Sequence, residues 1–104
     1  MEKQFFFFKL IPPRISFSKD MTDAERAIMM EHIQYWKGLT ERGVSVLFGP
    51  VMEPQGGWGL GILEVENEEA AKAIGDKDPS VIQKLNTFEV HPMRIGMIRN
   101  SNPA

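Results

Sequence analysis

Four segments of the chain have the hydrophobic pattern of β-strands. Residues 4–11 are an apolar run with an aromatic bias, and Pro12-Pro13 closes it because proline cannot donate to a strand ladder. Residues 44–52 and 58–65 are two further strands joined by a glycine-rich turn. Residues 86–98 supply the last strand. The first two strands are apolar on both faces, whereas a sheet with one face in water normally has a polar side.

A helical pattern follows a polar loop over residues 12–21. Thr22 and Glu25 have the spacing of a capping box, in which each residue accepts a hydrogen bond from the backbone of the other. The helix is predicted over residues 23–42. Gly43 is expected to end it, because glycine adopts the left-handed conformation most easily.

Two shorter helices are predicted in the second half of the chain. Asn67 is an N-cap before an acidic first turn, and Gly75 is expected to end that helix. Asp78 before Pro79 is a second N-cap followed by a first-turn proline. This pair predicts a short helix through Leu85.

The predicted order of elements is strand, helix, strand, strand, helix, strand. This order is typical of one α+β domain, here residues 1–104, with ferredoxin-like βαββαβ topology and a four-stranded antiparallel sheet. Right-handed crossovers place both helices on the same face of the sheet. The other face then carries surplus apolar surface, so we expect a homodimer that packs sheet to sheet.

Composition narrows the classes of function. The chain has 104 residues, a net charge of −2 and no basic block, so no nucleic-acid partner is expected. It has no cysteine, which excludes a thiolate metal site and a cysteine nucleophile. With only two histidines, a metal site built mainly from histidine is not expected, and no metal is predicted. The apolar run 5–11 is too short to span a membrane. We interpret it as a buried strand, and we expect a cytoplasmic protein with a frayed polar end at residues 99–104.

One histidine lies on the apolar side of the first helix. At about 100° per residue, His32 falls inside the apolar stripe and is expected to point toward the core or a pocket. The stripe also contains Ile28, Tyr35, Trp36 and Leu39. Imidazole exchanges a proton near neutral pH, so His32 is the main candidate for chemistry.

Asp78 is a candidate carboxylate partner for His32 across the helical layer. A carboxylate on one ring nitrogen fixes the tautomer of a histidine and stabilises its cation. A structural interpretation stands beside this one. In it, His32 is a half-buried core residue bonded to a backbone carbonyl, and Asp78 is only an N-cap.

Four further residues are candidates for contacts with a substrate. Trp36 and Tyr35 border the apolar stripe, and Phe48 lies in the second strand, so their rings are candidates to stack on a ring compound. Arg14, in the polar loop, is a candidate to hold an anionic group. Core packing is the alternative for the aromatic residues, and a solvated loop is the alternative for Arg14. In a third interpretation Trp36, Phe48 and Met52 fill the cleft.

Several short motifs occur in a defined order along the chain. They are Glu31-His32-Ile33-Gln34-Tyr35-Trp36, Gly43, Phe48-Gly49-Pro50, Glu69-Ala70, Asp78-Pro79 and Val90-His91-Pro92. In this order the chain resembles the YCII-related family from residue 4 to about 98. The resemblance implies a dimeric α/β barrel, a His32–Asp78 dyad at a cleft, no metal or organic cofactor, and activity on small ring compounds. The loop 12–21 has no counterpart in that pattern.

Two functions remain open on the sequence alone. In the first, the protein is a small cofactor-independent enzyme whose His32–Asp78 dyad performs general acid–base chemistry on an aromatic or lactone-like molecule. In the second, the cleft binds a small ligand without turnover, or the dimer serves as an interaction unit. The sequence does not decide whether the chain is an enzyme.

Overall fold

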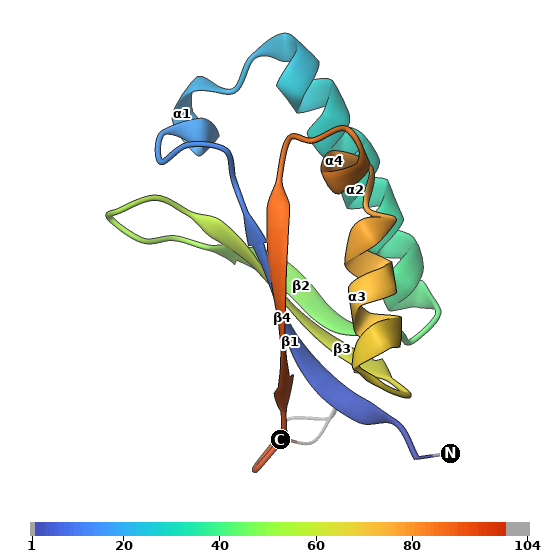
Figure 1. Cartoon of the computed structure of the whole chain (residues 1–104). Helices are drawn as coiled ribbons and strands as arrows, with labels where there is room; N and C mark the ends of the chain where they lie inside the picture. The colour runs from blue at the N-terminus through green and yellow to red at the C-terminus, as the bar shows by residue number, and fades with distance from the viewer. Residues whose placement is uncertain (1, 100–104) are drawn as a thin grey trace.

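A computed structural model describes residues 2–99 as a four-stranded antiparallel sheet with α2, α3 and α4 on one side (Figure 1). The strands are β1 (Gln4–Ile11), β2 (Ser45–Val51), β3 (Trp58–Val65) and β4 (Thr87–Met93). The helices are α1 (Phe17–Asp20), α2 (Asp23–Glu41), α3 (Glu68–Asp76) and α4 (Pro79–Ile82). The strand order is β2-β3-β1-β4, and every neighbouring pair is antiparallel. The predicted α+β class with ferredoxin-like topology is confirmed.

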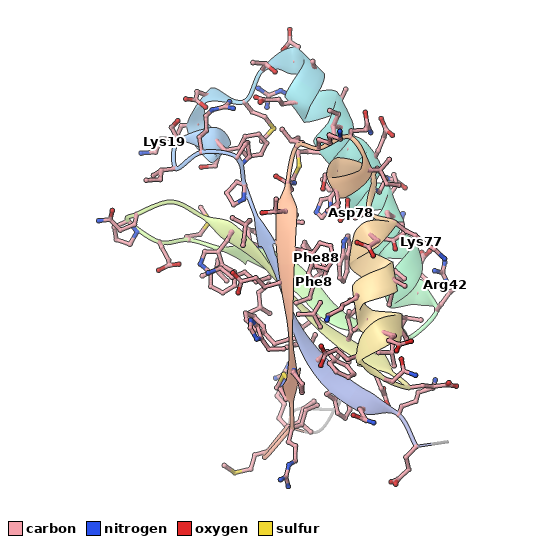
Figure 2. All side chains as sticks on the ribbon, in the orientation of Figure 1. Phe8, Lys19, Arg42, Lys77, Asp78 and Phe88 are labelled. Atoms are coloured by element: carbon pink, nitrogen blue, oxygen red, sulfur yellow. The ribbon has the colours of Figure 1, made fainter. Side chains whose placement is uncertain are left out.

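The core lies between the sheet and the helices and is built around the central strand β1. Side chains of a strand alternate between faces, and Phe6, Phe8 and Leu10 are the buried set. The Phe8 ring lies 4.8 Å from the Trp36 ring of α2 and stacks on Phe88 of β4 at 5.2 Å (Figure 2). Because three elements meet at one phenylalanine, these rings fix how α2 lies over the sheet.

The ends of α2, the longest described helix, follow the signals in the sequence. The Glu25 backbone N–H donates to Thr22 Oγ1 at 3.1 Å, and the Thr22 backbone N–H donates to Glu25 Oε1 at 2.9 Å. The predicted capping box is therefore present. Gly43 follows the helix with a φ of 77°, as its predicted role requires. No helix within residues 2–99 is long and apolar enough to cross a membrane.

The last strand is shorter than predicted. The sequence predicts a strand over residues 86–98, but β4 ends at Met93, which pairs with Phe5 near the start of β1. Only Gln4 of β1 lies beyond this pair, so the residues after Met93 leave the sheet. Of the frayed end predicted at residues 99–104, residues 100–104 lie outside the described part of the chain.

Two local predictions near the helices are also wrong. The predicted loop 12–21 contains the one-turn helix α1, which forms because Phe17 is buried against the rest of the molecule. Helix α4 is predicted through Leu85 but ends at Ile82, because Lys84 takes a left-handed backbone with φ 61°. A segment of about four residues is too short to show a helical pattern of hydrophobic residues. The sequence therefore indicates neither the helix around Phe17 nor the early end of α4.

Gly75 does not end α3, although the sequence suggests it. The helix continues through Asp76, and Lys77 caps it with an ordinary φ of −97°. Gly75 is buried, and a Cβ built there would lie 2.5 Å from Cζ of Phe88. The glycine is therefore required by the close approach of β4 to the helix.

Gly75→Ala is expected to destabilise the fold by about 1–3 kcal/mol, because its methyl group overlaps the Phe88 ring. This loss exceeds the roughly 1 kcal/mol that alanine gains over glycine inside a helix. Gly38→Ala is the matched control, since Gly38 is also helical but its Cβ would meet only the flexible end of Arg42. Urea unfolding should show a loss for the first variant and a gain for the second. Equal stability of Gly75→Ala and wild type would contradict the packing role.

Candidate functional site

A pocket of about 660 Å³ opens on the helix side of the sheet beside the edge strand β2. Helix α2 forms one wall, and β2 and β3 form another. Residues 12–21, which include α1, close it from a third side and are called the roof below. The lining is mostly apolar and includes Phe17, Met29, Ile33, Trp36, Phe48 and Met52. His32 also belongs to it.

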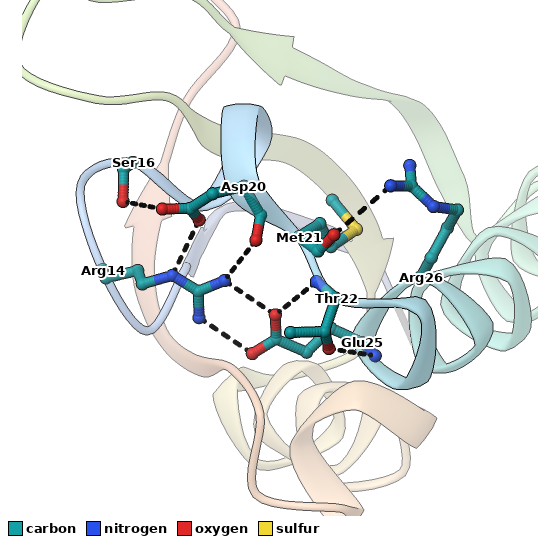
Figure 3. A network of polar contacts seen from close by, with 7 residues as sticks. All are labelled: Arg14, Ser16, Asp20, Met21, Thr22, Glu25 and Arg26. Atoms are coloured by element: carbon teal, nitrogen blue, oxygen red, sulfur yellow. Dashed lines mark hydrogen bonds and ion pairs between the residues drawn. The ribbon is translucent and has the colours of Figure 1, made fainter.

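The roof is held in place by ion pairs around Arg14 (Figure 3). The Arg14 guanidinium donates to Asp20 Oδ1 at 2.8 Å and to the two Glu25 oxygens at 2.7 and 2.8 Å. The Ser16 hydroxyl donates to the second Asp20 oxygen at 2.6 Å. The hydrogen bond from Arg14, followed by that from the Thr22 backbone, lowers the pKa of Glu25 to about 2. The network joins the roof to the first turn of α2.

Two residues that the sequence suggested for ligand contact lie outside the pocket lining. Arg14 is bound by the carboxylates described above and lies over the Phe17 ring at 5.3 Å. The Tyr35 hydroxyl donates to the backbone carbonyl of Ile74 at 2.6 Å. Burial, with a smaller effect from the charge of Asp78, raises the pKa of Tyr35 to about 12. In this structure Arg14 therefore anchors the roof, and Tyr35 anchors α2 to α3.

The side chains of His32 and Asp78 meet in the interior. His32 Nδ1 lies 2.7 Å from Asp78 Oδ2, and the two residues are 3% and 0% exposed. An ionised carboxylate only accepts hydrogen bonds, so Nδ1 carries the proton and Nε2 of the neutral ring carries a lone pair. No protein group within residues 2–99 bonds Nε2. Since His32 lines the pocket, Nε2 is the ring nitrogen left for a ligand.

Asp78 is fully buried between α2 and α4 and accepts four hydrogen bonds (Figure 2). Oδ2 accepts from His32 and from Trp36 Nε1 at 2.8 Å. Oδ1 accepts from the backbone N–H and the hydroxyl of Ser80, both at 2.8 Å. Burial acts to raise the pKa of Asp78, but the bonds from His32, Trp36 and Ser80 outweigh it and hold the pKa below its usual value. The carboxylate therefore stays ionised without contact with water.

Trp36 and Phe48 connect the buried pair to the pocket. Trp36 stacks on Phe48 with 4.3 Å between ring centroids, and Phe48 lies 5.2 Å from the His32 ring at a steep angle. Phe48 fits here because Gly59 and Gly61 have no side chains: a Cβ at either would lie 2.8 or 2.9 Å from the ring. Phe48 thus fills the space left by the glycines, and the pocket lies beside it.

Three residues of the site are missed by sequence reasoning: Phe17, Ser80 and Asn86. A signal exists for Ser80, which is the second residue after an aspartate N-cap and so stands where the capping bond is normally donated. Phe17 lies in a polar loop, and Asn86 follows a short helix without any local motif. Their places in the pocket lining follow only from the tertiary structure.

A histidine paired with a carboxylate in this way is an arrangement suited to proton transfer. Asp78 on Nδ1 would stabilise an imidazolium if Nε2 took a proton from a bound compound. Within residues 2–99, no three side chains of histidine, aspartate or glutamate come together as a metal ion would need.

Asp78→Asn is expected to lower the free energy of unfolding by about 2–4 kcal/mol at pH 7. The asparagine amide has an NH₂ group in place of one carboxylate oxygen. In one orientation this group faces the N–H of Trp36 and in the other the N–H of Ser80, so one donor always meets another donor. Urea unfolding measures the loss. Asp76→Asn, at an exposed carboxylate two residues away, is the control and should stay within about 0.5 kcal/mol of wild type.

The loss of unfolding free energy caused by Asp78→Asn should become smaller in acid. The pKa of Asp78 is lower in the folded chain than the value of about 3.9 expected in the unfolded chain. Its contribution to stability is therefore complete above about pH 4 and is lost as the pH falls through the folded-state pKa. A difference between wild type and Asp78→Asn that did not decline below about pH 4 would contradict this assignment.

A comparison with protein families gives a further finding. The model of the YCII-related domain matches residues 14–94 of the 104-residue chain. The matched span contains His32 and Asp78 and begins after β1. None of the curated proteins that were compared matches the sequence.

Proposed function

The chain belongs to the YCII-related domain family, and we propose that it is a small enzyme in which His32 exchanges a proton with an aromatic or lactone-like ring compound. The observation that supports this most is the buried hydrogen bond between Asp78 and His32 at the pocket wall. A carboxylate on Nδ1 holds the imidazole in one tautomer and leaves Nε2 basic toward the pocket. The proposed activity uses no metal or organic cofactor.

In the proposed reaction His32 acts first as a base. Nε2 takes a proton from an O–H or an acidic C–H group of the bound compound. The resulting imidazolium stays bonded to Asp78 through Nδ1–H, and the negative charge left on the compound faces this cation. His32 then acts as an acid and returns the proton to another atom of the compound, so that no net proton is consumed.

The apolar lining of the pocket supports this chemistry. The attraction between an imidazolium and a nearby anion is stronger in an apolar site than in water, because the effective dielectric constant is lower. The stacked rings of Trp36 and Phe48 form part of the lining. A flat ring compound fits such a wall, since aromatic surfaces prefer stacked or edge-on contacts.

A second function, binding without turnover, is favoured by the structural use of Asp78. Its four hydrogen bonds cap α4 and tie that helix to α2, so the pair has a role in the fold itself. In this function the apolar lining of the pocket holds the compound, and no proton passes to or from His32. Saturable binding without product, unchanged in a His32 variant, distinguishes this function from the first.

We also propose a cytoplasmic location. The sequence has no cysteine, which suits a reducing compartment. The apolar run at residues 5–11 lies in β1, which pairs with β3 on one side and β4 on the other. The apolar side chains of this run therefore belong to an inner strand of the sheet.

A second copy of the chain is the proposed cover for the open face of the sheet, which is turned away from α2, α3 and α4 (Figure 1). On this face Leu47, Ile62 and Phe7 lie side by side across β2, β3 and β1. Trp58 packs against Phe7 with 6.0 Å between centroids. Leu47 is 48% exposed. Such a row suits sheet-to-sheet packing, and two-fold symmetry brings the same row of both copies together.

His32→Gln is expected to reduce turnover at least about a hundredfold, because glutamine remains polar but cannot exchange the proton. Substrates are found first by screening small ring acids and lactones against the wild-type protein. His91→Gln is the control: His91 lies exposed on β4 outside the pocket lining, where it bonds Glu89 and stacks on Phe7. Circular dichroism should show that both variants are folded. Full activity of His32→Gln on such a substrate would rule out the general-base role.

Ile62→Glu is expected to turn the dimer into monomers, because the new carboxylates meet each other across the two-fold axis. Ile82→Glu is the matched control: Ile82 is 62% exposed on α4 and lies away from the open face. Light scattering after size-exclusion chromatography measures the mass of each protein. A monomeric wild type at micromolar concentration would refute the proposed dimer.

A further inference from the structure

Asn86 is a buried polar residue whose hydrogen bonds are incomplete. It lies between α4 and β4 and is 3% exposed. Its Nδ2 group donates to the sulfur of Met29 at 3.3 Å, but Oδ1 is buried without any hydrogen-bond partner. Within residues 2–99 it is the one buried side-chain oxygen or nitrogen in this state. Proteins seldom leave a buried acceptor unpaired, because it destabilises the fold.

Turning the amide over does not remove the mismatch. The NH₂ group would then take the position that has no partner, and the carbonyl would face the Met29 sulfur, which has no hydrogen to donate. The orientation with one satisfied donor is therefore the better one. The polar atom without a partner is an acceptor.

This acceptor belongs to the same pocket as the buried pair. Asn86, Met29 and His32 all line it. Met29 precedes His32 by three residues on α2, which is a rise of about 4.5 Å along the helix axis. The Asn86 amide contacts the Met29 side chain and so lies on the same stretch of the pocket wall as His32.

We propose that Asn86 Oδ1 positions the ligand by accepting a hydrogen bond from an O–H or N–H group on a flat, otherwise apolar compound. The inference rests on the function proposed above and adds the chemical class of the compound. Its rings would pack on the apolar lining, and its donor would pair with the amide oxygen. A carboxylate at this place would face the oxygen without a donor, so the site selects neutral donors over anions.

The contact requires the Asn86 amide to turn, because Oδ1 is covered in this structure. Met29 touches the other end of the amide, where its sulfur accepts from Nδ2. A methionine has three rotatable bonds and a polarisable sulfur, so it can follow such a turn at little cost. The Asn86 backbone N–H donates to the Ser80 carbonyl at 3.0 Å, which holds the backbone of Asn86 in place.

Indole and 1-methylindole test the donor, because they differ only in the replacement of N–H by N–CH₃. Calorimetric titration of the wild-type protein should give a dissociation constant for indole about tenfold lower than for 1-methylindole, the preference expected from one buried hydrogen bond. Asn86→Leu keeps the branched shape of the side chain but removes the acceptor. In this variant the two constants should agree within about twofold. Asn86→Ala gives the same comparison if leucine is not accommodated.

His32→Gln separates this inference from the proposed catalytic role. It should lose turnover but keep the preference for indole. A preference that disappears in His32→Gln and persists in Asn86→Leu would assign the donor contact to His32 and overturn the role of Asn86, while the general-base role would stand. Failure of indole, the probe that carries the donor, to bind the wild-type protein would also overturn the role of Asn86.

The melting temperature distinguishes a ligand-binding asparagine from a purely structural one. Removal of an unpartnered acceptor should leave the Tm of Asn86→Leu, measured without probe, equal to or above that of wild type. A lower Tm combined with an unchanged preference for indole would mean that Oδ1 is satisfied by an ordered water, and would refute the proposal.

Discussion

The carboxylate of Asp78 is the point on which both the fold and the site depend. A charge with no exposure to water is stable only when hydrogen bonds replace its hydration. Those bonds come from His32 and Trp36 on α2 and from Ser80 on α4. The same four bonds cap α4, tie it to α2 and set the tautomer of the imidazole. Structure and chemistry therefore cannot be altered separately at this residue.

The aromatic layer around this carboxylate gives the pocket its shape. Trp36 bonds Asp78 through its indole nitrogen and stacks on Phe48, which also meets the His32 ring. Phe48 reaches this position only because β3 carries glycine where a side chain would collide with it. The pocket beside these rings is apolar, so the few polar atoms at its wall have a large influence on what binds. Nε2 of His32 and the buried Oδ1 of Asn86 are two such atoms that no protein group within residues 2–99 satisfies.

The charged groups of the roof lie outside the pocket lining. The ion pairs of Arg14 with Asp20 and Glu25 fasten the roof to α2, and their charges do not line the pocket. The roof turns only Phe17 and other mostly apolar side chains inward. The sequence predicts a solvated loop here, with Arg14 as a candidate to hold an anion. The segment instead contains a short helix. A buried aromatic side chain and three carboxylate contacts order it, and none of these is a local signal.

Features that depend on neighbours a few positions apart could be predicted from the sequence. The capping box of Thr22, the Asp78-Pro79 helix start, strand β1 and the apolar stripe that contains His32 all rest on local periodicity and local hydrogen bonds. Features that depend on distant groups follow only from the folded chain: the indole bond to Asp78, the end of β4 near the start of β1, and the role of Gly75. The pairing of His32 with Asp78 lies between these cases, because the sequence supplied both residues but only the packing of α2 against α4 brings them to 2.7 Å. Burial and hydrogen-bond geometry are properties of the folded chain, and no local pattern encodes them.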